Sequence, residues 1–260
     1  MLAAQTPAAY IKKGEIIEVP AHGLFGHHWL VDIEGLGTFE TYPNRSCLRY
    51  LPHFDLEENA SLYRGLLRFV GWCNFMKSLV ALRYLDGGDS HDLSGKTFRA
   101  FTANLMSKPE ATTKSLAAFL EVPEKADEIK RLEWLGILDD TPIPLKSGAN
   151  VDVLINLMLA RMSYQPGEKD MIIVHDEIVV ELGDRTERRL STLHVEGDPN
   201  GSSAMSRAVS LPAATATRLI LEGMLDLTGV QMPLRPEIYK PILESLGKLG
   251  FNFRHQTIPV

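Results

Sequence analysis

The sequence predicts an α/β (α+β) fold, in which a mixed β-sheet drawn from the two ends of the chain holds an inserted all-helical subdomain. Strand-like runs fill the chain up to about residue 72, helix-like apolar spacing follows from about 74 to 165, and strand patterns return from 171 to 195. Apolar residues recur about every two positions in the strand-like regions and about every 3.6 positions in the helix-like region. With 260 residues, of which 45% are hydrophobic, the chain is long enough to bury a stable core without a disulfide or a structural metal.

Three short strands are expected in the first part of the chain. The segments 15–19, 28–33 and 38–42 are rich in β-branched and aromatic residues, which suit a half-buried pleated surface. Glycine and proline residues separate these segments or follow them, and both residue types are typical of turns. The three strands are therefore expected to connect through tight turns.

Helices are expected in the middle of the chain. Shorter candidates cover 97–106 and 112–120, and two longer amphipathic segments follow them. In those two segments apolar residues recur at helical spacing: Ile129, Leu132, Leu135 and Leu138, then Val151, Leu154, Ile155, Met158 and Met162. Each set is predicted to form one buried helical face.

A long β-hairpin is expected after residue 170. Alternate positions of its first arm carry apolar residues on one face, which are Ile172, Val174, Ile178, Val180 and Leu182. Residues at such positions point to the same side of a strand. Residues 183–186 are expected to form the turn, and 188–195 the returning arm.

Two helices are expected in the last part of the chain. The first covers 203–224, with Ser202 or Ser203 available as its N-terminal cap. Pro212 lies inside this segment and is expected to kink or split the helix. The second helix follows Pro236 and leads to an apolar end.

Composition and charge argue against several classes of function. The formal net charge is −6, whereas binding to a phosphate backbone needs concentrated positive charge, so no nucleic-acid partner is expected. No apolar run approaches the roughly 20 residues of a spanning helix, so no membrane partner is expected. The two cysteines, Cys47 and Cys73, are too few for a disulfide framework and favour a reducing, cytoplasmic location.

No cofactor or metal site is expected within the chain itself. Gly35-Leu36-Gly37 lacks the third glycine and the following helix of a dinucleotide-binding loop. His22, His27 and His28 lie close together in the sequence, but without the spacing of a metal-binding motif.

Arginines that precede the helical region are the main candidates for binding residues. Arg45 follows a strand in a Pro-Asn-Arg turn, and loops at such positions often present functional side chains. If residues 63–69 are extended, Arg64, Leu66 and Arg68 share a face, and two guanidinium groups can converge on carboxylates. From spacing alone, arginines that are simply solvated are the favoured alternative.

Two of these segments resemble sequence boxes of a known family. Residues 42–46, Tyr-Pro-Asn-Arg-Ser, resemble the YPNR or LPNR box of the NADP-dependent, L-glutamate-forming saccharopine dehydrogenases, also called saccharopine reductases. Residues 63–71 resemble the FRGTLRYxG box of that family. Further segments agree in order and spacing, at 6–16, 133–138, 169–172 and 212–223. The resemblance extends over essentially the whole chain.

The resemblance implies that this chain holds the substrate. The residues expected to bind it are Arg45 and Arg64, with Asn44, Gly65, Leu66 and Arg68 as further candidates. Ser46 and Cys47 stand where the family usually has aspartate and serine, and Phe69 replaces a tyrosine. Leu66 replaces a threonine and can offer only a backbone contact.

The resemblance also implies roles for the parts of the chain. Residues 1–70 and 169–203 are expected to form an α/β substrate-binding and dimerisation core, 71–168 a helical insertion, and 204–260 a C-terminal helical segment. The family begins with a nucleotide-binding Rossmann half that has no counterpart here, so we expect a fragment that is inactive alone and has no cofactor of its own. A Rossmann domain, in cis or in trans, and a second copy of the chain are the expected partners. No catalytic residue is assigned, since the family's proposed acid/base residues lie in or beside that half.

The intact enzyme is expected, by this resemblance, to interconvert saccharopine with glutamate and aminoadipate semialdehyde by hydride transfer with NADP(H), as part of lysine metabolism. Two alternatives remain open. A related dehydrogenase acting on carboxynorspermidine has the same fold and chemistry, but its amine-bearing substrate favours acidic pocket residues. The other alternative is a noncatalytic binding or dimerisation module.

Overall fold

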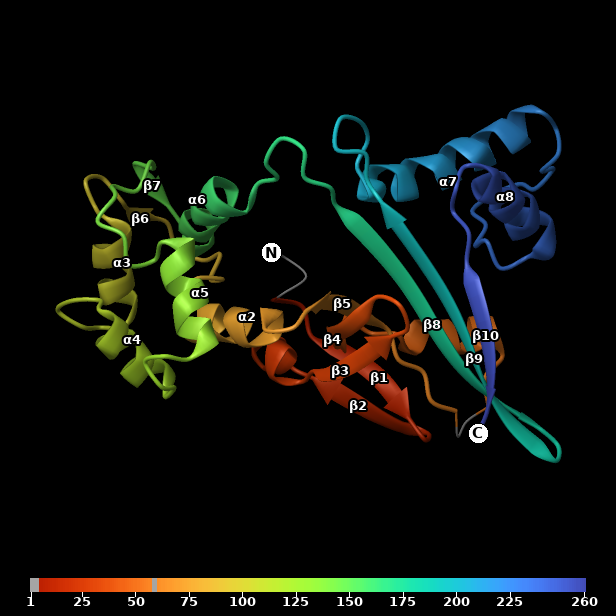
Figure 1. Ribbon diagram of the computed structural model, residues 1–260, viewed down its shortest axis with the longest axis horizontal. Coiled ribbons are helices and arrows are strands. Elements are labelled where there is room, and N and C mark those ends of the chain that lie inside the picture. The colour runs from red at the N-terminus through yellow and green to blue at the C-terminus, as the bar shows by residue number, and fades with distance from the viewer. Residues whose placement is uncertain (1–4, 58–59) are drawn as a thin grey trace. The chain divides into compact units, whose positions relative to one another are not determined.

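Helices and several small antiparallel sheets make up the chain (Figure 1). The computed structural model describes residues 5–57 and 60–260, which fall into two units, Met1–Ser163 and Tyr164–Val260. This architecture confirms the predicted α/β class, with helices between two groups of strands. The strands are divided among several small antiparallel sheets instead of one mixed sheet. Short turns, which can join only antiparallel neighbours, connect some of the pairs, and longer segments connect the others.

Two sheets form the first part of the first unit. Their strands are β1 (Ala8–Lys12), β2 (Glu15–Val19), β3 (Trp29–Ile33), β4 (Gly37–Pro43) and β5 (Gly65–Phe69). β1 pairs with β2, while β4 lies between β3 and β5. β2, β3 and β4 confirm the predicted strands, and β5 confirms that the segment with the second arginine box is extended. The sequence analysis gives no strand at β1, since Ala8 and Ala9 weaken the strand pattern. Short helical turns connect these strands: η2 (Ala21–Gly26), η3 (Leu48–Tyr50) and α1 (Leu51–Phe54).

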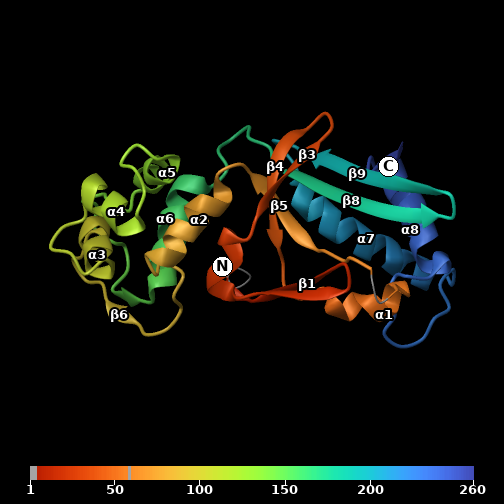
Figure 2. The same ribbon diagram turned by 90° about the horizontal axis from the view of Figure 1, so that it is seen from below.

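Helices occupy the rest of the first unit and gather beyond the end of α2 in Figures 1 and 2. They are α2 (Trp72–Ala81), α3 (Phe98–Leu105), α4 (Thr113–Leu120), α5 (Asp127–Leu135) and α6 (Asn150–Met162), with a short strand pair, β6 (His91–Asp92) and β7 (Ser147–Gly148). α3 and α4 confirm the predicted helices, and the predicted apolar face of α5 is buried. On α6 the buried apolar residues are Val153, Leu154 and Leu157, while Ile155 and Met162 are exposed. The predicted face is therefore rotated, because apolar residues surround most of this helix and the sequence alone does not select one side.

One hydrophobic core connects the strands and the helices of the first unit. It includes Tyr10, Val19 and Tyr42 from the strands, and residues such as Leu79 and Leu154 from the helices. The helical region is thus continuous with the core beneath the sheet.

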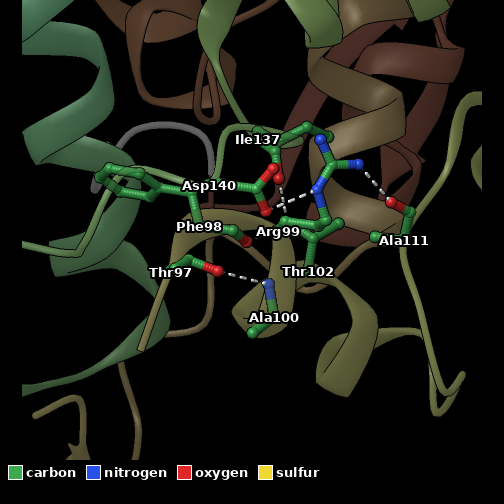
Figure 3. Close-up of polar contacts among 8 residues, drawn as sticks. All are labelled: Thr97, Phe98, Arg99, Ala100, Thr102, Ala111, Ile137 and Asp140. Carbon is green, nitrogen blue, oxygen red and sulfur yellow. Dashed lines mark hydrogen bonds and ion pairs between the residues drawn. The ribbon is translucent and has the colours of Figure 1, made fainter. Parts of the chain in front are cut away.

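Buried polar contacts fix α3 against the loops around it (Figure 3). The Thr102 hydroxyl donates to the Ile137 carbonyl at 2.6 Å, and it lies 2.7 Å from the hydroxyl of Tyr84, which is fully buried. Arg99 donates to Asp140 at 2.8 Å and to the carbonyl of Ala111 at 2.9 Å. The contacts of Thr102 satisfy polar groups that would otherwise be buried without partners, whereas the ion pair of Arg99 with Asp140 lies at the surface.

The second unit is built on a long hairpin. Its strands are β8 (Met171–Leu182), β9 (Arg185–Glu196) and β10 (Arg254–Pro259), and its helices are α7 (Ala204–Leu221) and α8 (Pro236–Lys248). The hairpin confirms the prediction, and Ser203 caps α7 by accepting from the amide of Ser206 at 3.0 Å. α7 is continuous through Pro212, so the prediction of a split helix is wrong. The proline removes one backbone hydrogen bond, but the burial of Thr215 and Leu219 beyond it offsets this loss. β10 was missed, because its polar residues do not alternate clearly with apolar ones.

The apolar face predicted for β8 is only partly covered. α7 and α8 lie beside the hairpin (Figures 1 and 2) and pack on Ile172, Leu193 and neighbouring residues. Further along the strand, Val174 is 42% exposed and Ile178 is 57% exposed. The sheet thus presents apolar side chains beyond the two helices.

Residues 5–57 and 60–260 contain neither a membrane-spanning helix nor a cluster of metal ligands. In this part of the chain no helix combines the length and the apolar character needed to cross a membrane. No group of three or more histidine, cysteine, aspartate or glutamate side chains is arranged to hold a metal ion. Cys47 and Cys73 are both buried and free.

Replacing Thr102 with valine is expected to destabilise the first unit by about 1–3 kcal/mol. Valine keeps the shape of the side chain but leaves the Tyr84 hydroxyl and the Ile137 carbonyl without their partner. Denaturant unfolding followed by circular dichroism measures the loss. The matched control is Thr113→Val. The Thr113 hydroxyl donates to the Glu133 carboxylate, and water can replace this contact when the hydroxyl is removed. Equal losses of stability in the two variants would contradict the prediction.

Candidate substrate-binding site

The candidate binding residues gather where β4 ends and β5 begins. Pro43, the last residue of β4, is paired with Gly65, the first residue of β5. One residue further out, the amide of Asn44 donates to the carbonyl of Arg64 at 3.0 Å. Strand pairing therefore brings the two arginine boxes together, although about twenty residues separate them in the sequence.

Arg45 turns the chain out of this sheet. Its backbone is left-handed, with a φ of 58°, a conformation that is uncommon for residues other than glycine. Its carbonyl accepts from the amide of Ala9 in β1 at 3.2 Å. Five other non-glycine residues in the described part of the chain share a positive φ, so the conformation alone does not mark a site. At Arg45 it places an exposed arginine directly beside the start of β5.

The side chain of Arg64 is exposed and lies near an aromatic ring. Its guanidinium carbon is 6.0 Å from the centre of the Tyr50 ring, and that of Arg49 is 5.0 Å from it. Arg49 also donates to the Tyr50 hydroxyl at 3.0 Å, and this hydrogen bond lowers the pKa of Tyr50. Two cationic groups thus flank one ring at the edge of the candidate site.

Gly65 allows an aromatic side chain to lie across the sheet. A Cβ atom at this position would lie 2.3 Å from the Tyr63 hydroxyl and 2.6 Å from the Thr41 hydroxyl. These two hydroxyls are 3.0 Å apart, and burial raises the pKa of Tyr63. A residue larger than glycine would displace them. The neighbouring Leu66 is half-buried and paired with Tyr42.

Arg68 lies at the other end of β5 from Arg64. It is half-buried, its guanidinium carbon is 5.7 Å from the centre of the Trp72 ring, and it donates to the carbonyl of Leu67 at 3.0 Å. The structure thus brings together Asn44, Arg45, Arg64, Gly65 and Leu66, and it separates Arg68 from them. None of the three arginines of the two boxes forms a salt bridge within the described residues.

Glu40 is a central residue that the sequence analysis did not identify. It lies in β4, is only 3% exposed, and accepts from the amide of Gly71 at 2.8 Å and from that of Cys73 at 2.7 Å. Burial alone would raise the pKa of Glu40, but these hydrogen bonds outweigh it and lower the pKa. Burial and the adjacent Glu40 raise the pKa of the Cys73 thiol to about 12, which keeps that thiol unreactive.

An aromatic group lies on the opposite face of the sheet from Glu40 and Arg68. The Tyr63 ring is 4.6 Å from Trp29 and 5.4 Å from Tyr10, measured between ring centres. The Tyr10 hydroxyl lies 2.9 Å from Nε2 of His27. Because these rings contact one another, they hold β1 and β3 against the strand that carries the second arginine box.

The arrangement is suited to binding anions. Planar guanidinium groups that have no carboxylate partner in the protein can bind carboxylates in bidentate fashion. A signal for this was present in the sequence, as the alternation of Arg64, Leu66 and Arg68. No signal identified Glu40, since a charged residue in an alternating strand is expected to face solvent.

Known proteins provide a consistent set of matches. The family model described as "Saccharopine dehydrogenase C-terminal domain" matches residues 1–251. The chain is 31% identical to the alpha-aminoadipic semialdehyde synthase of Arabidopsis thaliana, covering 98% of this chain and 26% of that protein. It is 29% identical to the saccharopine dehydrogenase (NADP(+), L-glutamate-forming) of Saccharomyces cerevisiae, covering 99% of this chain and 60% of that protein.

A solved structure agrees with these matches. The apo histidine-tagged saccharopine dehydrogenase (L-Glu forming) from Saccharomyces cerevisiae gives a TM-score of 0.86 at 28% identity, over 99% of this chain and 60% of that chain. The chain therefore spans about a quarter of the synthase and three fifths of the fungal dehydrogenase.

Glu40→Gln is expected to destabilise the first unit by about 1–3 kcal/mol near pH 7, because a neutral amide accepts the two backbone hydrogen bonds more weakly. The folded pKa of Glu40 lies below its ordinary value. The carboxylate therefore stabilises the fold fully above its ordinary pKa, and this contribution is lost as the pH falls through the lowered folded value. The difference between wild type and variant should narrow in acid.

Denaturant unfolding at about pH 7 and about pH 3 tests this dependence. Glu110→Gln is the control, because Glu110 is exposed, and it should change stability little at either pH. A difference for Glu40→Gln that stays constant or grows in acid would contradict the assignment.

Proposed function

Since the chain belongs to the saccharopine dehydrogenase C-terminal domain family, we propose that it is the substrate-binding part of an NADP-dependent oxidoreductase that interconverts saccharopine with glutamate and aminoadipate semialdehyde. The observation that supports this proposal is the pairing of β4 with β5, which brings the backbones of the two arginine boxes together, while neither Arg45 nor Arg64 has a salt-bridge partner among the described residues. The relatives named saccharopine dehydrogenase are oxidoreductases.

The charge of the substrate fits these two arginines. Saccharopine carries three carboxylates, whereas the chain has a net charge of −6, so binding requires fixed positive charge at one place. Arg45 and Arg64 supply that charge where the sheet ends, and the planar fork of each can bind one carboxylate through two hydrogen bonds. Asn44 is held between them by its backbone hydrogen bond to Arg64.

In this proposal the chain contributes orientation to the reaction. NADP(H), which the names of the fungal relatives include, is bound by a nucleotide-binding domain outside these residues. The oxidation transfers a hydride from the carbon beside the secondary amine of saccharopine to the cofactor, and hydrolysis of the resulting imine yields the two products. Holding the carboxylates would orient that carbon for hydride transfer, and such orientation lowers the barrier.

The second unit is proposed to make a homodimer. The exposed apolar side chains of β8 continue beyond the residues that α7 and α8 cover. Exposed apolar patches of this kind often mark an interface. A symmetric pairing of two such sheets would cover them in both copies.

Arg64→Ala is expected to raise the KM for saccharopine strongly in an enzyme that combines this chain with a nucleotide-binding domain. Losing one partner of a desolvated charge pair costs roughly 2–5 kcal/mol, which corresponds to a factor of about 30 to several thousand. Arg45→Ala should act in the same way. Arg→Lys at either position should restore binding only in part, because the bidentate geometry is lost.

Steady-state kinetics measures these effects, with circular dichroism to confirm folding. The control is Arg161→Ala, since Arg161 is exposed on α6 and pairs with Asp139; its KM should equal that of wild type. If kcat/KM is unchanged in both Arg45→Ala and Arg64→Ala, the proposed binding role is wrong.

Light scattering is expected to give about twice the chain mass for the purified protein. Ile178→Asp should shift the measured mass toward that of the monomer, because a charge would be buried in the proposed sheet interface. Leu159→Asp is the control, since Leu159 is 65% exposed on α6 and should leave the mass unchanged. A wild-type monomer at tens of micromolar, or equal effects of both variants, would contradict an interface at the sheet.

A further inference from the structure

A second group of hydrogen-bond donors lies at the end of β5 that is distant from Arg45 and Arg64. In the strand register, Tyr42 is paired with Leu66, and Glu40 is paired with Arg68. Paired residues, and residues two positions apart on one strand, point to the same face of a sheet. Tyr42, Leu66 and Arg68 therefore share the face that carries the buried Glu40.

Glu40 brings a further side chain to this face. Its carboxylate holds the amides of Gly71 and Cys73 at the start of α2. Trp72, the first residue of α2, lies between them, and the guanidinium carbon of Arg68 is 5.7 Å from the centre of its ring. The cap of the helix thus fixes Trp72 beside Arg68.

The donors in this group have no carboxylate partner in the described residues. Nε1 of Trp72 is buried and makes no hydrogen bond of ordinary geometry there, although it lies close enough to the Tyr42 hydroxyl to lower the pKa of that group, as Arg68 also does. Arg68 donates to the Leu67 carbonyl but forms no salt bridge in the same part of the chain, and both oxygens of Glu40 are occupied by backbone amides. Burial raises the pKa of Tyr42 more than the contacts with Arg68 and Trp72 lower it, so its hydroxyl keeps its proton, lies beside both donors and can itself donate. A buried donor without an acceptor is rare in proteins and calls for a ligand or another explanation.

Resting on the function proposed above, we propose that Arg68, Trp72 and Tyr42 form a second carboxylate subsite. It would hold a carboxylate of the substrate remote from the one that Arg45 and Arg64 bind. Arg64 and Arg68 are four residues apart on one extended strand, which corresponds to about 14 Å. A long substrate with carboxylates at both ends can lie along β5 and reach both subsites. Such a pair of anchors would select long dicarboxylic or tricarboxylic amino acids over short ones.

Calorimetric titration of the purified chain with saccharopine tests this subsite. Trp72→Phe keeps the aromatic ring and removes only the N–H donor, and it should weaken binding roughly tenfold. Arg68→Gln should weaken it at least as much, and Arg68→Lys should restore part of the loss. The matched control is Trp134→Phe, since Trp134 is exposed on α5 and should bind as wild type does.

The double variant Arg64→Ala, Arg68→Gln separates one shared carboxylate from two distinct ones. If the two arginines hold different carboxylates, their effects on the dissociation constant should multiply, whereas a shared carboxylate gives a combined effect smaller than the product. Unchanged melting temperatures of the single variants exclude a loss of folding as the cause.

The outcomes distinguish the two proposals. If Arg64→Ala weakens binding while Trp72→Phe and Arg68→Gln bind as Trp134→Phe does, the second subsite is wrong and the proposed function stands. If the arginine effects do not multiply, the subsite is likewise not separate. If wild type binds no saccharopine at millimolar concentration, the proposed function fails, and this inference fails with it.

Discussion

The structure of the first unit depends on one buried carboxylate. Glu40 lies in the central strand of its sheet and caps the start of α2 through two backbone amides. The first amides of a helix have no partner within the helix, and the positive end of the helix dipole favours a negative charge there. Burying a carboxylate is costly unless it is hydrogen-bonded, so the strand and the helix stabilise each other through this one contact. Gly71 makes the contact possible, since its φ of 93° is strained for any residue with a Cβ atom.

The same central strand also determines how the arginines are arranged. Its register with β5 pairs Pro43 with Gly65 at one end and Glu40 with Arg68 at the other. A shift of one residue would turn Arg64 and Arg68 to the opposite face and would turn Tyr63 away from the Trp29 ring that it contacts there. Gly65 reinforces this register, because only a residue without a side chain leaves room for Tyr63. The core that fixes the strands therefore also fixes the spacing between cationic groups.

Sequence reasoning predicted what depends on local pattern. The strands β2, β3 and β4, the helices α3 and α4 and the long hairpin follow from alternation, helical spacing and turn residues. The proximity of Arg45 and Arg64 could be expected only through the family resemblance, because spacing alone does not show that β4 and β5 are neighbours. The burial of Glu40, the rotated face of α6 and the strand β10 could not be predicted, because each depends on segments distant in the sequence. Charged or polar residues in strands are normally expected to face solvent, and Glu40 differs because a helix end lies above it.

Ion pairs are unevenly distributed among the arginines of the first unit. Arg45, Arg64 and Arg68 form none within the described residues, and neither do Arg49 and Arg131. Arg83, Arg99 and Arg161 each lie within salt-bridge distance of an aspartate. An arginine that is paired in this way contributes little to the local potential, whereas an unpaired one leaves a positive region that attracts anions. In a chain with a net charge of −6, such a region can persist only where acidic side chains are distant from the arginine or are hydrogen-bonded to other groups. Glu40 meets this condition, since it is the acidic residue paired with Arg68 and its two oxygens are committed to α2. The interaction that joins the sheet to the helices thus also leaves the Arg68 guanidinium without a salt bridge to the acidic residue paired with it.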